Sequence, residues 1–332
     1  MRALITGGAG FIGSHLAERL VREGQEVSVI DNMSTGSLSN IEGLRNKSHF
    51  EFVKGDIRNA ELLRPLVERS EVVYHLAAAV GVQLIADRPV HTIETNIDGT
   101  QAVLEAARGG VKKVLIASSS EVYGKNEAVP FREDDDIVLG NTSVSRWSYA
   151  CSKAIDEFLG FAFYQQYGLE VIIGRLFNTI GPRQTGRYGM VVPRFVQSAL
   201  SNEPVRVFGT GQQSRCFCYV DDVVEALIGL MNCSGTAGRA YNIGSQEEIT
   251  IEGLADKIIE MTGSRSKKEF VGYQEAYGRP IEDMMRRAPS LERIKETTGW
   301  VPKTSLTDAL GSIIDHFRRQ GKVKKSVKKE QR

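Results

Sequence analysis

The sequence predicts an α/β protein, in which a doubly wound parallel sheet is followed by a smaller C-terminal α/β lobe. The first 120 residues repeat one rhythm of a short apolar run, a turn and an amphipathic stretch of helical length. The first apolar run leads directly into a glycine-rich loop. The length of 332 residues suits about two domains, or one large domain with an appended part.

Short apolar runs alternate with helical patterns along the first part of the chain. The expected strands are residues 3–6, 27–30, 50–54, 72–76 and 113–118. The expected helices between them are residues 13–23, 60–68 and 90–107. Because the strands are mostly β-branched runs without polar alternation, both faces of the sheet should be covered. We expect a parallel sheet of seven strands with right-handed crossovers.

The pattern changes after about residue 148. A long helix is expected at 148–167 and a strand at 170–175, before a loop rich in glycine and proline at 178–188. Two more helices are expected at 192–201 and 250–262. The expected organisation is a first domain of residues 1–175 to which 219–244 return, a lobe of 176–218 and 245–317, and a basic, disordered tail of 318–332.

The glycine-rich loop is the first candidate site. Gly7, Gly10 and Gly13 lie between a strand and a helix, where backbone amides and the helix dipole can bind a pyrophosphate. The second strand ends in Asp31, which can accept hydrogen bonds from an adenosine ribose. No arginine follows it, since the next residue is Asn32, so NAD is favoured over NADP. A triplet of glycines also occurs in ordinary surface turns. Here, however, a strand, the loop, a helix, a second strand and an acid follow one another in the order of a nucleotide site, which favours that interpretation.

Tyr149 and Lys153 form the second candidate site. They lie four residues apart on a predicted helix and therefore share one face. An ammonium beside a phenol lowers the pKa of the phenol and makes it a better base. Spacing of this kind is also common on helix surfaces. The serines at the end of the strand 113–118 favour the catalytic interpretation, because ligands bind at the carboxyl ends of such strands.

Together these motifs resemble one known family. The motifs are GGAGFIG, Asp31-Asn32, Gly55-Asp56-Ile57, His75-Leu76-Ala77-Ala78, Asn96, SSSEVYG, YxxxK, Phe177-Asn178 and Gly181-Pro182-Arg183. Their order is similar to that of the extended short-chain dehydrogenase/reductases, and more narrowly to the NAD-dependent nucleotide-sugar epimerase/dehydratase group. The resemblance extends to about residue 317. Each motif is modest by itself, and their combination is specific.

The resemblance implies a Rossmann-type domain and assigns roles to individual residues. Tyr149 would be the base, Lys153 would bind the nicotinamide ribose and Ser119 would hold the substrate hydroxyl, with Glu121 beside them. The other cofactor residues implied are Gly7, Gly10, Phe11, Ile12, Gly13, Asp31, Asn32, Asp56, Ile57, Leu76, Ala77, Ala78, Asn96 and Ser118. The substrate residues implied are Asn178, Met190, Val191, Arg206, Phe208, Arg215, Arg279 and Arg287. The arginines suit a diphosphate, although each could instead be an ordinary surface arginine, and Phe208 an ordinary core residue.

The resemblance also implies oxidation of the sugar C4 hydroxyl to a 4-keto intermediate, after which three reactions are possible. A 4,6-dehydratase would have an Asp-Glu pair where this chain has Ser120-Glu121, so dehydration ranks third. The Ser-Glu pair and Arg287 resemble UDP-glucuronate decarboxylases, which give UDP-xylose. Ile85, however, stands where those enzymes have a tyrosine near the substrate carboxylate, and an apolar residue is a poor partner for a charge.

The sequence therefore ranks a 4-epimerase of the UDP-glucose type first and a decarboxylase second. In either case Glu121 could orient groups or relay protons, or simply bond to nearby backbone amides. A protein of another class, a non-catalytic NAD-binding regulator with this fold, would usually lack the Tyr149–Lys153 pair. The presence of both residues favours an enzyme.

Composition and charge set the remaining expectations. The formal net charge of +1 gives no case for nucleic acid or a membrane as partner, and no apolar run reaches the ~18 residues of a membrane span. There are only four cysteines, and no histidine pattern suggests a metal, so we expect a metal-free cytoplasmic protein. Eight of the 42 basic residues lie in 318–332, so the rest of the chain is acidic. The resemblance further implies a homodimer through a four-helix bundle of helices 92–108 and 148–167.

Overall fold

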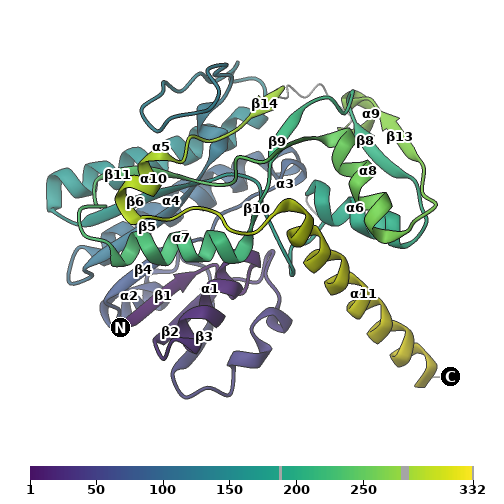
Figure 1. Ribbon diagram of the computed structural model, residues 1–332. Coiled ribbons are helices and arrows are strands. Elements are labelled where there is room, and N and C mark those ends of the chain that lie inside the picture. The colour runs from purple at the N-terminus through teal and green to yellow at the C-terminus, as the bar shows by residue number, and fades with distance from the viewer. Residues whose placement is uncertain (187–188, 278–283, 331–332) are drawn as a thin grey trace.

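The core of the protein is a parallel sheet of seven strands in the order β11-β6-β5-β4-β1-β2-β3. The computed structural model describes residues 1–186, 189–277 and 284–330 (Figure 1). The sheet strands are β1 (Arg2–Thr6), β2 (Glu26–Asp31), β3 (Phe50–Lys54), β4 (Val72–His75), β5 (Lys113–Ser119), β6 (Glu170–Leu176) and β11 (Arg239–Ile243). This arrangement confirms the predicted fold class, and the first six strands lie where the apolar runs predict them.

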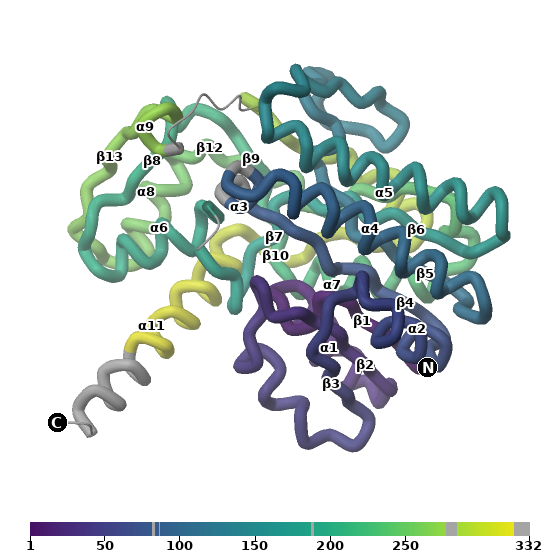
Figure 2. The backbone as a smooth tube through the Cα atoms, turned by 180° about the vertical axis from the view of Figure 1, so that it is seen from behind, coloured from purple at the N-terminus to yellow at the C-terminus, as the bar shows by residue number. Residues whose placement is uncertain are grey.

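Helices cover both faces of the sheet. On one face lie α1 (Phe11–Arg22), α7 (Val220–Asn232) and α10 (Glu292–Thr298); on the other lie α2 (Ala60–Glu68), α4 (Pro89–Ala107) and α5 (Arg146–Tyr167) (Figure 2). Successive β1 side chains enter the two cores alternately, because strand side chains point to opposite faces. Ala3 and Ile5 pack with α1 and α7, whereas Leu4 packs with α2 and α4.

A further core, separate from the two on the faces of the sheet, belongs to the smaller lobe. It is formed by apolar side chains of α6 (Val191–Leu200), β8 (Val205–Phe208), α8 (Ile251–Thr262) and α11 (Leu306–Glu330) (Figure 1). The other strands are β7 (Thr179–Ile180), β9 (Ser214–Cys216), β10 (Cys218–Tyr219), β12 (Glu248–Thr250), β13 (Lys268–Val271) and β14 (Arg286–Arg287). The remaining short helices are α3 (Val82–Asp87) and α9 (Tyr273–Tyr277), with 3-10 turns at Leu38–Asn40, Glu42–Leu44 and Ser120–Tyr123.

Two segments differ from expectation. Leu291, Ile294 and Trp300 pack in the core of the sheet and not in that of the lobe. The amphipathic α10 is too short for its pattern to stand out in the sequence, so only the packing reveals its place. The tail, expected to be disordered, continues α11 as helical backbone through Glu330. Lysine and arginine are good helix formers, so a basic composition does not by itself prevent a helix.

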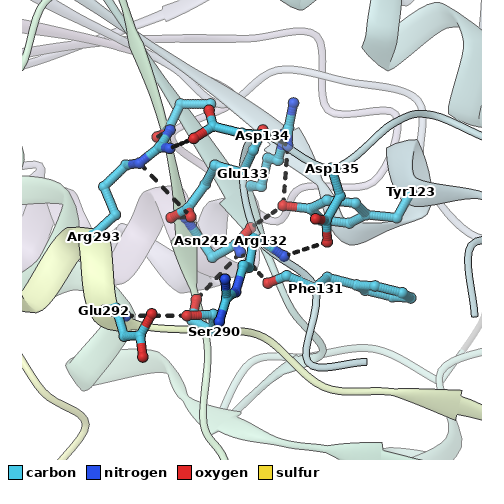
Figure 3. A network of polar contacts seen from close by, with 12 residues as sticks. Tyr123, Phe131, Arg132, Glu133, Asp134, Asp135, Asn242, Ser290, Glu292 and Arg293 are labelled. Carbon is cyan, nitrogen blue, oxygen red and sulfur yellow. Dashed lines mark hydrogen bonds and ion pairs between the residues drawn. The ribbon is translucent and has the colours of Figure 1, made fainter. Parts of the chain in front are cut away.

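Polar contacts join the loop of residues 131–135 to the far edge of the sheet (Figure 3). The backbone amide of Asn242 on β11 donates to Glu133 Oε1 at 2.9 Å, and the Tyr123 hydroxyl donates to Asn242 Oδ1 at 2.7 Å. Arg293 forms ion pairs with Glu133 and Asp134. These contacts, together with Phe131 buried against Tyr123 and Phe177, fix the loop on the edge of the sheet.

Arg175 anchors the same region to α5. Its guanidinium donates to both carboxylate oxygens of Glu157, at 2.7 to 3.2 Å, and also to the hydroxyl of Tyr123 and the carbonyl of Glu133. Arg175 is 6% exposed and Glu157 4%. This buried pair therefore ties the end of β6 to the helix that carries Tyr149 and Lys153.

Candidate active site

A cavity of about 950 Å³ lies where the carboxyl ends of the sheet strands meet the smaller lobe. It is lined by segments that follow six neighbouring strands, β6, β5, β4, β1, β2 and β3, as expected for a ligand site in a doubly wound sheet. Among the described residues, one predicted site residue, Asn96, does not line it. Arg279 lies outside the described residues. The others line it: Gly7, Gly10, Phe11, Ile12, Gly13, Asp31, Asn32, Asp56, Ile57, Leu76, Ala77, Ala78, Ser118, Ser119, Glu121, Tyr149, Lys153, Asn178, Met190, Val191, Arg206, Phe208, Arg215 and Arg287.

The glycine loop leaves its backbone open to a ligand. Gly7 has a φ of +71°, which an L side chain rarely adopts, and a Cβ on Gly13 would overlap the Gly7 carbonyl and lie 2.7 Å from Gly8 Cα. Gly10 is the N-cap of α1, and within the described residues no side chain caps that helix end. Its first-turn amides therefore remain available for an anion such as a pyrophosphate.

Asp31 ends β2 beside this loop. Its carboxylate accepts hydrogen bonds from the backbone amides of Ala9 at 3.0 Å and Met33 at 2.8 Å, and the residue is 7% exposed. Burial raises the pKa of Asp31, and these amides oppose the rise. Asp56 is already paired with Arg58, whose side chain lowers the pKa of Asp56 to about 2. Asp31 is therefore the acid that the fold holds next to the glycine loop.

Tyr149 lies at the inner wall of the cavity, 9% exposed. Its hydroxyl hydrogen-bonds the side chain of Ser119, which stands at the end of β5. Burial raises the pKa of Tyr149, and the charge of Lys153 and the bond to Ser119 lower it without offsetting the burial. The expected effect of the lysine is present, but the expectation of a net decrease is wrong for this structure, because the phenolate loses its hydration.

Glu121 lies near Tyr149 and is paired with two arginines. Arg287 Nη1 donates to Glu121 Oε1 at 2.7 Å and to Ser120 Oγ at 3.2 Å, and Arg146 Nη2 lies 3.4 Å from Glu121 Oε2. Burial raises the pKa of Glu121, but Arg287 and Arg146 outweigh it and lower the pKa to about 2. Glu121 is therefore a carboxylate, and not an acid, at neutral pH.

The lobe supplies the opposite wall. Arg194 stacks over the ring of Phe208, with 4.2 Å from its guanidinium carbon to the ring centre. Gln213 Nε2 donates to the carbonyl of Phe208 and to the hydroxyl of Tyr273. Arg206 lies within 4 Å of Glu269 and Glu275. An aromatic ring, amides and guanidinium groups are the groups that suit a base and a diphosphate.

Several lining residues escaped prediction from the sequence. Arg146 had a detectable signal, because it lies three residues before Tyr149 on α5 and so on nearly the same face. The lobe residues Arg194, Gln213 and Tyr273 had none, since they are distant in sequence and carry no motif.

Ile85 lines the cavity, whereas Asn96 does not. The side chain of Asn96 accepts a hydrogen bond from the backbone amide of Ala79 at 2.8 Å and donates one to Ser152 Oγ at 3.0 Å. Asn96 therefore supports the cavity wall without lining it. Direct contact of Asn96 with a cofactor stays a prediction, because the motif does not show which way the side chain points. Ile85 is buried, 6% exposed, and does line the cavity.

Residues 1–186, 189–277 and 284–330 contain no group of three or more His, Cys, Asp or Glu side chains able to hold a metal ion. The helices of the same ranges are too short or too polar to cross a bilayer.

Comparisons with known proteins agree with this geometry. Residues 4–313 match the model of a protein family described as GDP-mannose 4,6 dehydratase. A UDP-N-acetyl-alpha-D-glucosaminuronate decarboxylase of Bacillus cytotoxicus is 42% identical over 96% of this chain and 98% of its own. UDP-glucuronic acid decarboxylase 1 of Danio rerio is 36% identical over 96% of this chain and 73% of its own.

Solved structures of related proteins have the same fold. A UDP-glucose 4-epimerase of Thermotoga maritima, solved with UDP-glucose, is 31% identical with a TM-score of 0.87, over 96% of this chain and 99% of that one. A UDP-glucuronic acid 4-epimerase of Bacillus cereus, solved with UDP-glucuronic acid and NAD, is 28% identical with a TM-score of 0.86, over 96% of this chain and 100% of that one.

Proposed function

Because the chain belongs to the extended short-chain dehydrogenase/reductase family of nucleotide-sugar epimerases and dehydratases, we propose that it is an NAD-dependent decarboxylase of UDP-hexuronic acids. The substrate is a UDP-sugar whose C5 carries a carboxylate. The coarser assignment, an enzyme of this family acting on a nucleotide sugar, agrees with the sequence prediction. The finer assignment moves decarboxylation ahead of 4-epimerisation.

The cofactor is NAD, and the residues present fit it. The open backbone of Gly7 and Gly13 at the start of α1 suits the pyrophosphate, and Asp31 suits the adenosine ribose. When bound, NAD supplies the hydride acceptor that converts the C4 alcohol of the sugar to a ketone, and later the hydride that restores the alcohol.

The chain's own residues handle the proton and the orientation of the sugar. Tyr149 removes the proton of the C4 hydroxyl, and Ser119, already bonded to Tyr149, holds the same hydroxyl. Once C4 is a ketone, the C5 carboxylate is part of a β-keto acid. The bond between C5 and the carboxylate carbon then breaks, CO₂ leaves, and the electron pair of that bond passes to the enolate, which is protonated at C5.

A single observation supports the decarboxylase most strongly. Ser120, Glu121 and Arg287 are the residues on which the resemblance to decarboxylases rests, and Arg287 contacts both of the others across 166 or more positions of sequence. The cluster lines the cavity next to Tyr149. Arginine is well suited to orient a substrate carboxylate in a site from which water is excluded.

Ile85 supports a 4-epimerase as second candidate. It places a buried apolar side chain in the cavity wall where a group that binds a carboxylate would be expected. An epimerase needs the keto-sugar to turn over in the site, and an apolar wall permits that motion. The same wall, which also includes Leu84, would suit the methyl of a 2-acetamido group on a uronic acid. Dehydration stays third, because Glu121 is ionised and cannot donate a proton to a leaving hydroxyl.

The test is incubation of the enzyme and NAD with three substrates in parallel. UDP-glucuronate and UDP-N-acetylglucosaminuronate, each labelled with ¹³C at C6, and UDP-glucose are followed by NMR. We expect labelled CO₂ and a UDP-sugar lacking C6 from at least one uronate, and no reaction of UDP-glucose. A C4 epimer without CO₂ would instead establish the second candidate, and UDP-glucose turnover would exclude a requirement for the carboxylate.

We also propose that the protein is a homodimer through α4 and α5. These helices pack against each other on one face of the sheet and expose apolar side chains there, with Phe158 68% and Val90 66% exposed (Figure 2). Exposed apolar surface of this kind marks an interaction site.

Phe158→Glu is expected to convert the dimer to a monomer, because it places a charge in the apolar interface. Analytical ultracentrifugation at micromolar concentration measures the change. Phe270→Glu is the matched control, since Phe270 on β13 is 51% exposed but far from these helices in the fold. A wild-type monomer, or a Phe158→Glu dimer, would contradict the proposed interface.

A further inference from the structure

Lys153 has a dedicated partner that the proposed mechanism does not use. Its Nζ donates to Asp156 Oδ2 at 3.0 Å, one helical turn further along α5, and both residues are 2% exposed or less. Glu157, the next carboxylate, is already paired with Arg175 and accepts from Ser118. Asp156 is therefore the carboxylate that neutralises the buried ammonium.

A chain of hydrogen bonds runs from the strand that carries the glycine loop to Thr100, close to Asp156. The backbone amide of Ala77 donates to Thr6 Oγ1 at 3.1 Å, and Thr6 Oγ1 lies 2.8 Å from His75 Nδ1. His75 Nε2 lies 3.1 Å from Thr100 Oγ1. Burial raises the pKa of Asp156, the charge of Lys153 and the nearby Thr100 oppose the rise, and within the described residues Asp156 Oδ1 has no hydrogen-bond partner.

His75 is neutral and bridges two hydroxyls. Burial, with the nearby charge of Lys153, lowers the pKa of His75 to about 3, so its ring has one N–H. One ring nitrogen therefore donates to the hydroxyl that it faces, and the other accepts from the second hydroxyl, the two hydroxyls being those of Thr6 and Thr100.

This arrangement opposes the effect of burial on Lys153. Burial lowers the pKa of Lys153, but the charge of Asp156, with that of Tyr149 and the hydrogen bond to Asp156, raises it overall. Without a nearby carboxylate, a fully buried lysine tends to become neutral within the working pH range. A neutral Lys153 could no longer stabilise the phenolate of Tyr149.

We propose that Asp156, through its hydrogen bond and ion pair with Lys153, is the positioning residue that keeps Lys153 protonated and in place. The inference rests on the proposed function, in which Tyr149 is the base, and on the charge of Lys153, which favours the phenolate of Tyr149. The titratable groups that face the Lys153–Asp156 pair are Tyr149 and Glu157 on α5 and the neutral His75 on β4.

The first test is the pH profile of Asp156→Asn, a variant of nearly the same shape. Without the carboxylate, the pKa of Lys153 falls, so the alkaline limb of kcat/KM should move to lower pH by about one unit or more. Turnover relative to the parent should fall more at pH 9 than at pH 7, with the KM for the UDP-sugar little changed. Asp156→Glu should restore part of the shift, whereas Glu105→Gln, an exposed carboxylate on α4, should leave the profile unchanged. A uniform loss at all pH values would overturn the proposal.

The second test does not depend on turnover. In Asp156→Asn the folded-state pKa of Lys153 lies below its unfolded value of about 10.4, so the unfolded chain binds more protons. The variant therefore gains stability as pH rises toward that value, and its Tm deficit relative to the parent should shrink between pH 7 and 9.5. An unchanged deficit would overturn the proposal.

Two further variants keep both tests decisive. Adding Lys153→Met to Asp156→Asn should remove the pH-dependent part of the Tm deficit, because the titrating amine is gone. If Asp156→Asn does not fold, Thr100→Val replaces it, and it should shift the alkaline limb in the same direction. A wild type that turns over none of the three UDP-sugars would refute the proposed function, while the Tm comparison would still decide the role of Asp156.

Discussion

Tyr149→Phe is expected to lower kcat by roughly 10²- to 10⁴-fold, the usual contribution of a positioned general base, while NAD still binds. The hydroxyl is the group that faces Ser119, and its loss removes the proton acceptor for the sugar C4 hydroxyl. The ring itself remains buried and packed, so the fold should be retained. Turnover of the substrate found in the NMR assay and NAD binding by fluorescence titration measure the two effects.

Tyr164→Phe is the matched control for this prediction. Tyr164 lies on the same helix but is 39% exposed, so loss of its hydroxyl should leave kcat unchanged. If Tyr149→Phe retained the parent kcat, the base would have to be another group in the cavity, and the mechanism proposed above would be wrong.

Arg175→Met is expected to destabilise the protein by about 3–5 kcal/mol, because removal of one partner leaves a buried charge without compensation. Glu157 would keep only the hydrogen bond from Ser118, and the Tyr123 hydroxyl and the Glu133 carbonyl would each lose a donor. Urea unfolding followed by circular dichroism measures the loss. Since Glu157 lies on α5, kcat should also fall as Tyr149 and Lys153 lose their support.

Two variants separate the charge from the packing. Arg175→Met combined with Glu157→Gln should recover part of the stability, because no buried charge is then left unpaired. Arg45→Met breaks an ion pair with Glu42 in which both side chains are at least half exposed, and it should change stability by less than about 1 kcal/mol. An Arg175→Met variant as stable as Arg45→Met would show that the buried pair does not anchor α5.

The cofactor half of the site could be predicted because its signals are local. Gly7, Gly10, Gly13 and Asp31 fall within about thirty residues of sequence, and a strand–loop–helix–strand unit has few ways to fold. Tyr149 and Lys153 were predictable for the same reason, since a helix places residues four apart on one face. The motif containing Asn96, however, could not show that its side chain turns toward Ser152 and not toward the cavity.

The substrate half could not be predicted to the same depth. Arg287 comes from β14 and Glu121 from the turn after β5, and only the packing of the lobe on the sheet places them 2.7 Å apart. The pairing of Glu121 is also what keeps it a carboxylate at neutral pH despite its burial. Charge states such as this depend on three-dimensional neighbours and burial, which sequence spacing does not contain.

By itself, the sequence determined the doubly wound sheet, the NAD loop and the Tyr149–Lys153 pair, because periodicity and short spacings act over one or two elements of secondary structure. Only the tertiary structure decided that burial outweighs the effect of Lys153 on Tyr149, that Asp156 is the partner of Lys153, and that Arg287 meets Glu121. The physical reason is that desolvation and ion pairing depend on which side chains meet in the interior. These side-chain contacts are set by the packing of whole helices and strands against one another.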